Sequence, residues 1–228
     1  MTRLPVPRAV LADRVPHRSL RPDPSISPER SDLLVESLRD GRLRLTQLPD
    51  ETACGSAALV VARMLVEPSF RRGIWGPDPT ATRQRFADAL TATHRRTNAV
   101  APLRGQWGWP RRLGTSPEGM SGELDRIVPT TRYRTRLVHP DHLDRAWHDL
   151  SVTASSDRPV ALFIGTDLLP RHIVLAVGVD DDACAVYEPS SGRVVSLPRS
   201  EFLADDVSIA GGWRRPWALV LPTLENSV

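Results

Sequence analysis

The first two thirds of the chain carry apolar residues at helical spacing, in short stretches separated by prolines and glycines. The run from Gly55 to Leu65 is apolar on nearly every side, which predicts a buried helix that Pro68 ends. Further helices with one apolar stripe each are predicted from good N-terminal residues onward, at Ser31, Thr80, Ser116 and Asp141.

After Ser156 the pattern changes to short runs of apolar and β-branched residues separated by turn clusters such as DDD and SSG. This pattern predicts an antiparallel sheet. Helices followed by strands are typical of an α+β fold, with a helical half packed on the sheet. The five predicted strands are PVALFIG (159–165), HIVLAVGV (172–179), ACAVYEP (183–189), GRVVSLP (192–198) and PWALVLP (216–222).

The chain has 228 residues, of which 40% are hydrophobic and 25% are charged, enough apolar material for one sizeable core. Residues 1–30 are rich in Pro and Arg without a sustained period, so we expect an N-terminal arm followed by a single domain over residues 31–228. All 30 basic residues are Arg, which excludes a P-loop lysine, Schiff-base catalysis and a Ser-Lys dyad.

Charge and hydropathy limit the possible partners. The formal net charge is only +3 and the arginines are scattered, so we expect no nucleic-acid partner. The sequence lacks both the apolar core of a secretory signal and a stretch of about 20 apolar residues that could span a membrane. We therefore expect a cytoplasmic protein without a membrane partner. The sequence leaves the oligomeric state open.

No cofactor or metal is predicted. His139, His142 and His148 are interspersed with aspartates, but they fit the polar face of an amphipathic helix better than a metal site. The two cysteines, Cys54 and Cys184, are expected to be free thiols, because one distant pair without an export signal is not typical of a disulfide framework. Cys184 alternates with Val186 on a predicted strand and is expected in the core.

The most informative segment is QLPDETACGSAAL, in which Cys54 lies where a polar loop meets the buried helix. A sulfur at the positive end of a helix is favoured as thiolate, the form that a nucleophile needs. Gly55 and Ser56 are small, so a substrate carbonyl could approach the N–H groups of the first turn. The side-chain amide of Gln47 could donate to the same oxyanion.

A second group of candidates comes from the predicted hairpin around the Asp-rich turn. If its strands pair about residue 181, His172 lies within one cross-strand neighbour of Glu188. A carboxylate that accepts from one imidazole nitrogen fixes the tautomer, and the other nitrogen is then available to take a proton from a thiol. Cys54, His172 and Glu188 are therefore candidates for a nucleophile, a base and an orienting acid.

The order of Gln, helix cysteine, strand histidine and acid before Pro resembles the papain-like cysteine peptidases. The segments ACGSAAL, RHIVLAVGV and YEPSSGRVVSLPRSEFL are similar to the bacteriocin-processing, double-glycine peptidase domains and their actinobacterial relatives. This resemblance covers about residues 45–205. It implies a papain-like fold and a cysteine peptidase in which Cys54 is the nucleophile, His172 the base, Glu188 the orienting acid and Gln47 an oxyanion donor.

The chain departs from the family pattern at two positions. Glu188 stands where the family has Asp, so Ser190 or Ser191 could share the orienting role, and Ser56 follows Gly55 where many relatives have Pro. Three functions remain open. The chain could be a thiol hydrolase that cleaves a peptide or isopeptide bond, an acyltransferase or transglutaminase-like enzyme on the same triad, or a non-catalytic peptide-binding module. The expected partner in each case is a peptide or protein.

Overall fold

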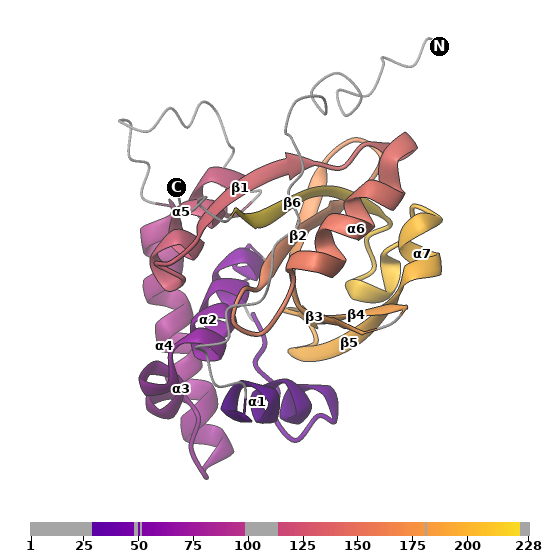
Figure 1. Cartoon of the computed structure of the whole chain (residues 1–228). Coiled ribbons are helices and arrows are strands. Elements are labelled where there is room, and N and C mark those ends of the chain that lie inside the picture. The colour runs from indigo at the N-terminus through magenta and orange to yellow at the C-terminus, as the bar shows by residue number, and fades with distance from the viewer. Residues whose placement is uncertain (1–28, 48–49, 51, 99–113, 181, 224–228) are drawn as a thin grey trace.

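The computed structural model of the chain describes residues 29–47, 50, 52–98, 114–180 and 182–223 (Figure 1). Most of the predicted N-terminal arm lies outside these residues, and the division of the chain into an arm and one domain remains a prediction. The described helices are α1 (Glu29–Arg39), α2 (Cys54–Val66), α3 (Pro68–Ile74), α4 (Pro79–Asn98), α5 (Pro117–Ile127), α6 (Leu143–Thr153) and α7 (Arg199–Leu203). Short 3-10 helices, η4 and η5, span Pro140–His142 and Ser208–Ala210.

The described strands form one six-stranded sheet in the order β1-β6-β2-β3-β4-β5, and every neighbouring pair is antiparallel. The predicted α+β class, with helices packed on an antiparallel sheet, is confirmed. The strands are β1 (Arg132–Leu137), β2 (Val160–Gly165), β3 (Pro170–Asp180), β4 (Ala183–Glu188), β5 (Arg193–Pro198) and β6 (Arg215–Thr223).

Helices cover both faces of this sheet. In Figure 1, α1 to α5 lie on one side, and α6 and α7 lie on the other. Successive side chains of a strand point to opposite faces of the sheet, so the side chains of β3 alternate between two apolar clusters, one on each face. Ile173 and Leu175 belong to the cluster with α2, whereas Val174 and Ala176 belong to the cluster with α6 and α7.

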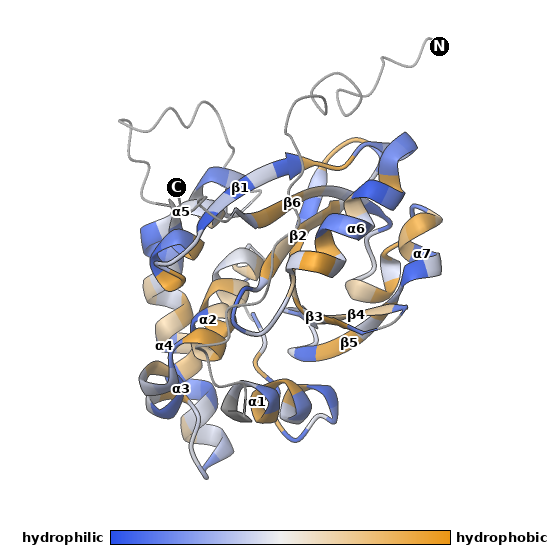
Figure 2. Ribbon diagram, in the orientation of Figure 1, coloured by the Kyte–Doolittle hydropathy of each residue, from blue (hydrophilic) through white to orange (hydrophobic). Residues whose placement is uncertain are grey.

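Helix α2 is the centre of the helical layer. Its side chains are buried from Cys54 to Ala62 without interruption, as the apolar run predicted, and Figure 2 shows it as more hydrophobic than α1, α3 and α4 around it. The helix packs against β3 on one side and against α3, α4 and α5 on the others. This central position holds the first residue of α2, Cys54, at the end of a fully packed element.

Several predicted helix ends differ from the observed ones. Helix α1 begins at Glu29, so Ser31 lies in its first turn, and α4 begins at Pro79, where the carboxylate of Asp78 accepts from the backbone N–H of Thr80 at 2.8 Å. Pro68 begins α3 after α2 has ended at Val66, since proline fits the first turn of a helix. Ser116 caps α5 as predicted, accepting from Gly119 N at 3.0 Å.

Candidate active site

Cys54 is the first residue of α2, and only 3% of it is exposed. The preceding residue, Ala53, offers no side chain that could cap the helix, and the first turn contains no acidic residue. The positive end of the helix is therefore not neutralised by the side chains of its own first turn. The predicted position of Cys54, where the loop meets the helix, is confirmed.

His172 and Glu188 meet as the predicted hairpin requires. Strands β3 and β4 pair Leu175 with Tyr187 and Ala176 with Val186, the predicted register, before a bulge shifts it by one residue. His172 Nε2 lies 2.8 Å from Glu188 Oε1, and each residue is only 5% exposed. This contact leaves Nδ1 of the imidazole for another partner.

The side chain of Cys54 is the other group that acts on the imidazole, as a hydrogen-bond partner and as a charge that raises the pKa of His172. Burial alone would lower the pKa of His172, but the bonds to Cys54 and Glu188 outweigh it and raise the pKa to about 9. The imidazole is therefore held in its charged form at neutral pH.

Glu188 is anchored by the turn that follows β4. Its Oε1 accepts from the backbone N–H of Ser190 and its Oε2 from that of Ser191, both at 2.7 Å. Burial would raise the pKa of Glu188, but the bonds from His172 and the two backbone amides lower it to about 2. Ser190 thus contacts Glu188 through its main chain, and the hydroxyl of Ser191 also donates to Glu188 O at 3.4 Å. A share of either serine in orienting His172 remains a prediction.

Gln47 is connected to the same turn. Its backbone N–H donates to Pro189 O at 2.9 Å, and the side chain is buried, with the residue 4% exposed. The hydroxyl of Tyr187 donates to Leu45 O, two residues earlier, so this segment is tied to β4 as well. The structure thus places Gln47 beside the turn that holds Glu188. Its role as an oxyanion donor remains a prediction.

Gly55 and Ser56 face the interior of the helical layer. A Cβ on Gly55 would lie 2.6 Å from Thr115 Oγ1 and 2.9 Å from Ile173 Cδ1, so the missing side chain permits close packing of α2. Ser56 is fully buried, and its hydroxyl lies 3.3 Å from His94 Nδ1 on α4. Their predicted part in binding substrate remains a prediction.

Sequence reasoning gave no role to three residues around the site, which are Asp50, His94 and Thr115. His94 connects Ser56 to the loop before Cys54, because its Nε2 lies 3.8 Å from Asp50 Oδ2. Thr115 is fully buried against Gly55, and its hydroxyl has no hydrogen-bond partner among the described residues. Each belongs to a segment distant in sequence from the residue that it contacts, and no local pattern marks it.

Cys184 lies within a strand of the sheet, whereas Cys54 is the first residue of a helix. Both thiols are free, as predicted, but Cys184 is fully buried within β4, and burial raises its pKa far above the ordinary value. It belongs to the cluster of α6 and α7, so its predicted place in the core is confirmed.

Comparisons with known proteins give matches at the level of structure. No protein-family profile and no curated protein sequence matches the chain. One similar solved structure is a double-glycine-motif protease from an AMS/PCAT transporter in complex with the leader peptide, with 14% identity, 80% of this chain and 96% of that chain covered, and a TM-score of 0.41. Another is the peptidase domain of Streptococcus ComA, a bifunctional ABC transporter involved in a quorum-sensing pathway. It is 12% identical, the match covers 80% of this chain and 98% of that chain, and the TM-score is again 0.41.

In the described part of the chain, no helix combines the length and the apolar composition that crossing a bilayer requires.

Proposed function

We propose that this protein is a thiol hydrolase that cleaves a peptide or isopeptide bond through an acyl-enzyme on Cys54. The observation that carries the proposal is the buried imidazole of His172, which bonds to Glu188 through Nε2 and to the side chain of Cys54. A nucleophile, a base and a group that orients the base are thereby aligned in hydrogen-bonded order.

The proposed reaction has two halves. The sulfur of Cys54 attacks the carbonyl carbon, and the imidazolium of His172 gives its proton to the leaving amine as the C–N bond breaks. The acyl group is then held as a thioester. His172, now neutral, takes a proton from water, the hydroxide attacks the thioester carbonyl, and the acid product leaves Cys54.

The charges at the site support the first half of this reaction. With a pKa of about 9, His172 is protonated at neutral pH and can act as the acid that the leaving amine needs. Glu188, with a pKa of about 2, remains a carboxylate and compensates the charge of the ring. Since Glu188 is itself held by two backbone amides, it can orient His172 without moving.

An oxyanion must also be stabilised when the carbonyl carbon becomes tetrahedral. We assign this role to backbone N–H groups at the start of α2 and to the side-chain amide of Gln47. The start of α2 suits an oxyanion because no acidic residue lies in its first turn. The buried position of Gln47 beside the Glu188 turn suits it because hydrogen bonds are strongest where water is excluded.

The test begins with thiol reactivity. The folded protein is treated with limiting iodoacetamide between pH 5 and 8 and followed by intact mass, with Cys54→Ala and Cys184→Ala beside the wild type. We expect one fast adduct that persists in Cys184→Ala and is lost in Cys54→Ala, because Cys54 has the imidazole of His172 as a partner, whereas burial within β4 raises the pKa of the Cys184 thiol. Labelling of Cys54 at the rate of an ordinary thiol of pKa about 8.5 would contradict the proposal and favour a binding module.

The second stage asks which bond is broken. A library of peptides is incubated with the wild type and with Cys54→Ala, and new chain ends are identified by mass spectrometry. Hydrolysis gives new carboxyl termini only with the wild type. If the products carry an added amine instead, in the presence of a simple primary amine, the enzyme transfers the acyl group rather than hydrolysing it.

A further inference from the structure

Gly211 lies directly against the imidazole of His172. A Cβ built on this glycine would be 2.8 Å from His172 Cδ2, 3.2 Å from Nε2 and 3.5 Å from Glu188 Cγ. Its φ of 131° also belongs to a region that residues with side chains rarely adopt. The main chain at Gly211 therefore forms a wall over the His172–Glu188 hydrogen bond, and both partners of that bond are only 5% exposed.

The loop that carries Gly211 runs from α7 to β6 and is firmly anchored. Val207 and Ala210 are fully buried in the cluster of α6 and α7. The backbone N–H of Val207 donates to Arg214 O at 2.9 Å, and that of Ala210 donates to Val207 O at the same distance. Asp205, earlier in the loop, bonds to Arg215 at the start of β6.

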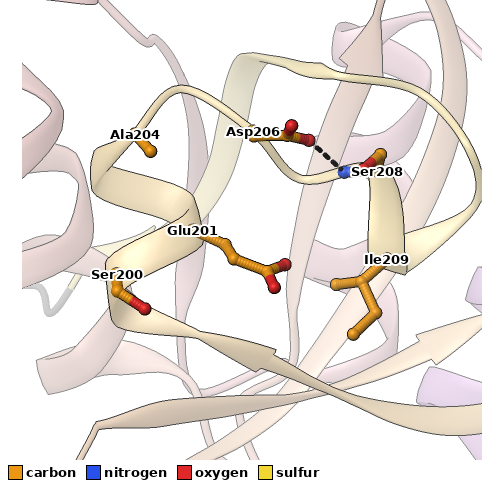
Figure 3. Close-up of a pocket in the computed structure, with 6 residues that line it drawn as sticks. All are labelled: Ser200, Glu201, Ala204, Asp206, Ser208 and Ile209. Carbon is orange, nitrogen blue, oxygen red and sulfur yellow. Dashed lines mark hydrogen bonds between the residues drawn. The ribbon is translucent and has the colours of Figure 1, made fainter.

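The earlier part of this loop also borders a hollow of about 490 Å³, which six residues line: Ser200, Glu201, Ala204, Asp206, Ser208 and Ile209 (Figure 3). Figure 3 shows the side chains of Glu201 and Ile209 pointing toward each other across it. Asp206, Ser208 and Ile209 of this loop thus border the hollow, Val207 and Ala210 lie in the core, and Gly211 lies against His172.

A side chain at residue 211 would meet an imidazole that has little room to withdraw. Ordinary contact begins near 3.4 Å, so His172 Cδ2 would have to move by about 0.6 Å. The ring is bonded on one side to Glu188 and on the other to Cys54. Because the loop is anchored as well, the displacement falls on these two hydrogen bonds.

We propose that Gly211 is a positioning residue, whose bare main chain keeps the imidazole of His172 seated between Glu188 and Cys54. This inference rests on the proposed function, because it concerns the same histidine. The role cannot be filled by another residue type, since both the contact and the φ of 131° require the absence of Cβ.

Gly212 provides the control. Its φ of 78° is also positive, but a Cβ there would meet nothing within 4 Å. Gly211→Ala and Gly212→Ala therefore both strain the loop, and only the first presses on His172. Both variants are first checked for the folded state by circular dichroism and thermal unfolding.

Two measurements then separate the variants. We expect iodoacetamide labelling of Cys54 to slow by about tenfold or more in Gly211→Ala, because a misplacement of about 1 Å at a reacting pair can cost about a hundredfold. In the same variant the NMR titration midpoint of His172 should fall from near pH 9 toward 6.5. Gly212→Ala should match the wild type in both. Equal effects of the two substitutions would overturn the proposal.

If Gly211→Ala does not fold, the wild type still decides the question. The Hα protons of Gly211 should give a strong NOE to the ring proton on Cδ2 of His172, and their chemical shifts should titrate with the midpoint of His172, whereas those of Gly212 should not. Absence of this NOE would overturn the inference. Slow labelling of Cys54 in the wild type would contradict the proposed function instead, and the NOE and titration would still test the position of the ring.

Discussion

Replacing Glu188 with Gln should lower the pKa of His172. The substitution keeps the size of the side chain but removes the charge that faces His172 Nε2 at 2.8 Å. The two oxygens of the Glu188 carboxylate also accept hydrogen bonds from Ser190 N and Ser191 N. The single side-chain oxygen of Gln can accept only some of these bonds. The amide nitrogen of Gln must then face a donor, either the imidazole or one of the backbone amides.

The size of the expected change in pKa follows from the pKa of His172 in the wild type. The pKa of His172 is raised from 6.5 to about 9, which corresponds to about 3 kcal/mol in favour of the charged ring. Burial opposes that charge, so the bonds to Cys54 and Glu188 together must exceed this value. If Glu188 supplies even half of it, Glu188→Gln lowers the pKa of His172 by about one to two units.

The assay is an NMR titration of the histidine side chains between pH 5 and 10, with the His172 resonance identified by its loss in His172→Asn. Glu188→Asp is the matched control, because it keeps the negative charge while withdrawing it by one methylene. We expect the order wild type, Glu188→Asp, Glu188→Gln from the highest midpoint to the lowest. A His172 midpoint that stays near pH 9 in Glu188→Gln would refute the role of Glu188 in holding the charged ring.

The remaining predictions concern stability and packing. The folded pKa of His172 is raised above its unfolded value of 6.5, so its contribution to stability, up to about 3 kcal/mol, is fully present below pH 6.5 and is lost as the pH rises through about 9. The folded pKa of Glu188 is depressed from 4.5 to about 2, so the contribution of Glu188 to stability is present above pH 4.5 and is lost as the pH falls through about 2. Urea unfolding should therefore show the largest stability difference between wild type and Glu188→Gln from pH 4.5 to 6.5, and a difference that is constant from pH 3 to 10 would contradict this. Gly55→Ala should destabilise the fold by about 1–3 kcal/mol, because its Cβ would lie within 3 Å of Thr115 and Ile173. Gly122→Ala in the middle of α5, where nothing lies within 4 Å, should instead stabilise it by about 0.5–1 kcal/mol, and similar urea midpoints for the two variants would show that the packing at Gly55 is not tight.

The pairing of His172 with Glu188 could be predicted because it depends on local rules. A strand has a period of two residues, and a short Asp-rich turn fixes which residues lie opposite each other. The position of Cys54 was equally accessible, since an apolar run following a polar loop marks the start of a buried helix. In both cases the deciding contacts are close in sequence, or follow from a regular element.

Strand β1 and the shorter helices escaped prediction for a different reason. The segment RYRTRL places arginines at every second position, and its apolar residues Tyr133 and Leu137 are too few to give a strand signal. It becomes a strand because it pairs with β6, where Arg132 lies opposite Thr223. Such pairing joins residues 91 positions apart, and a local pattern does not record it.

Residues distant in sequence also join the two halves of the candidate site. Leu45 N donates to Gly192 O, Gln47 N donates to Pro189 O, and the hydroxyl of Tyr187 donates to Leu45 O, so the segment before the Cys54 loop is bonded to both sides of the Glu188 turn. The same turn donates two backbone N–H groups to Glu188 itself. The acid that holds His172 and the glutamine proposed for the oxyanion are thus positioned by one group of hydrogen bonds. A change in that turn is bound to disturb both roles together, whereas a change at Gly211 acts on His172 and on its bonds to Glu188 and Cys54 and leaves Gln47 in place.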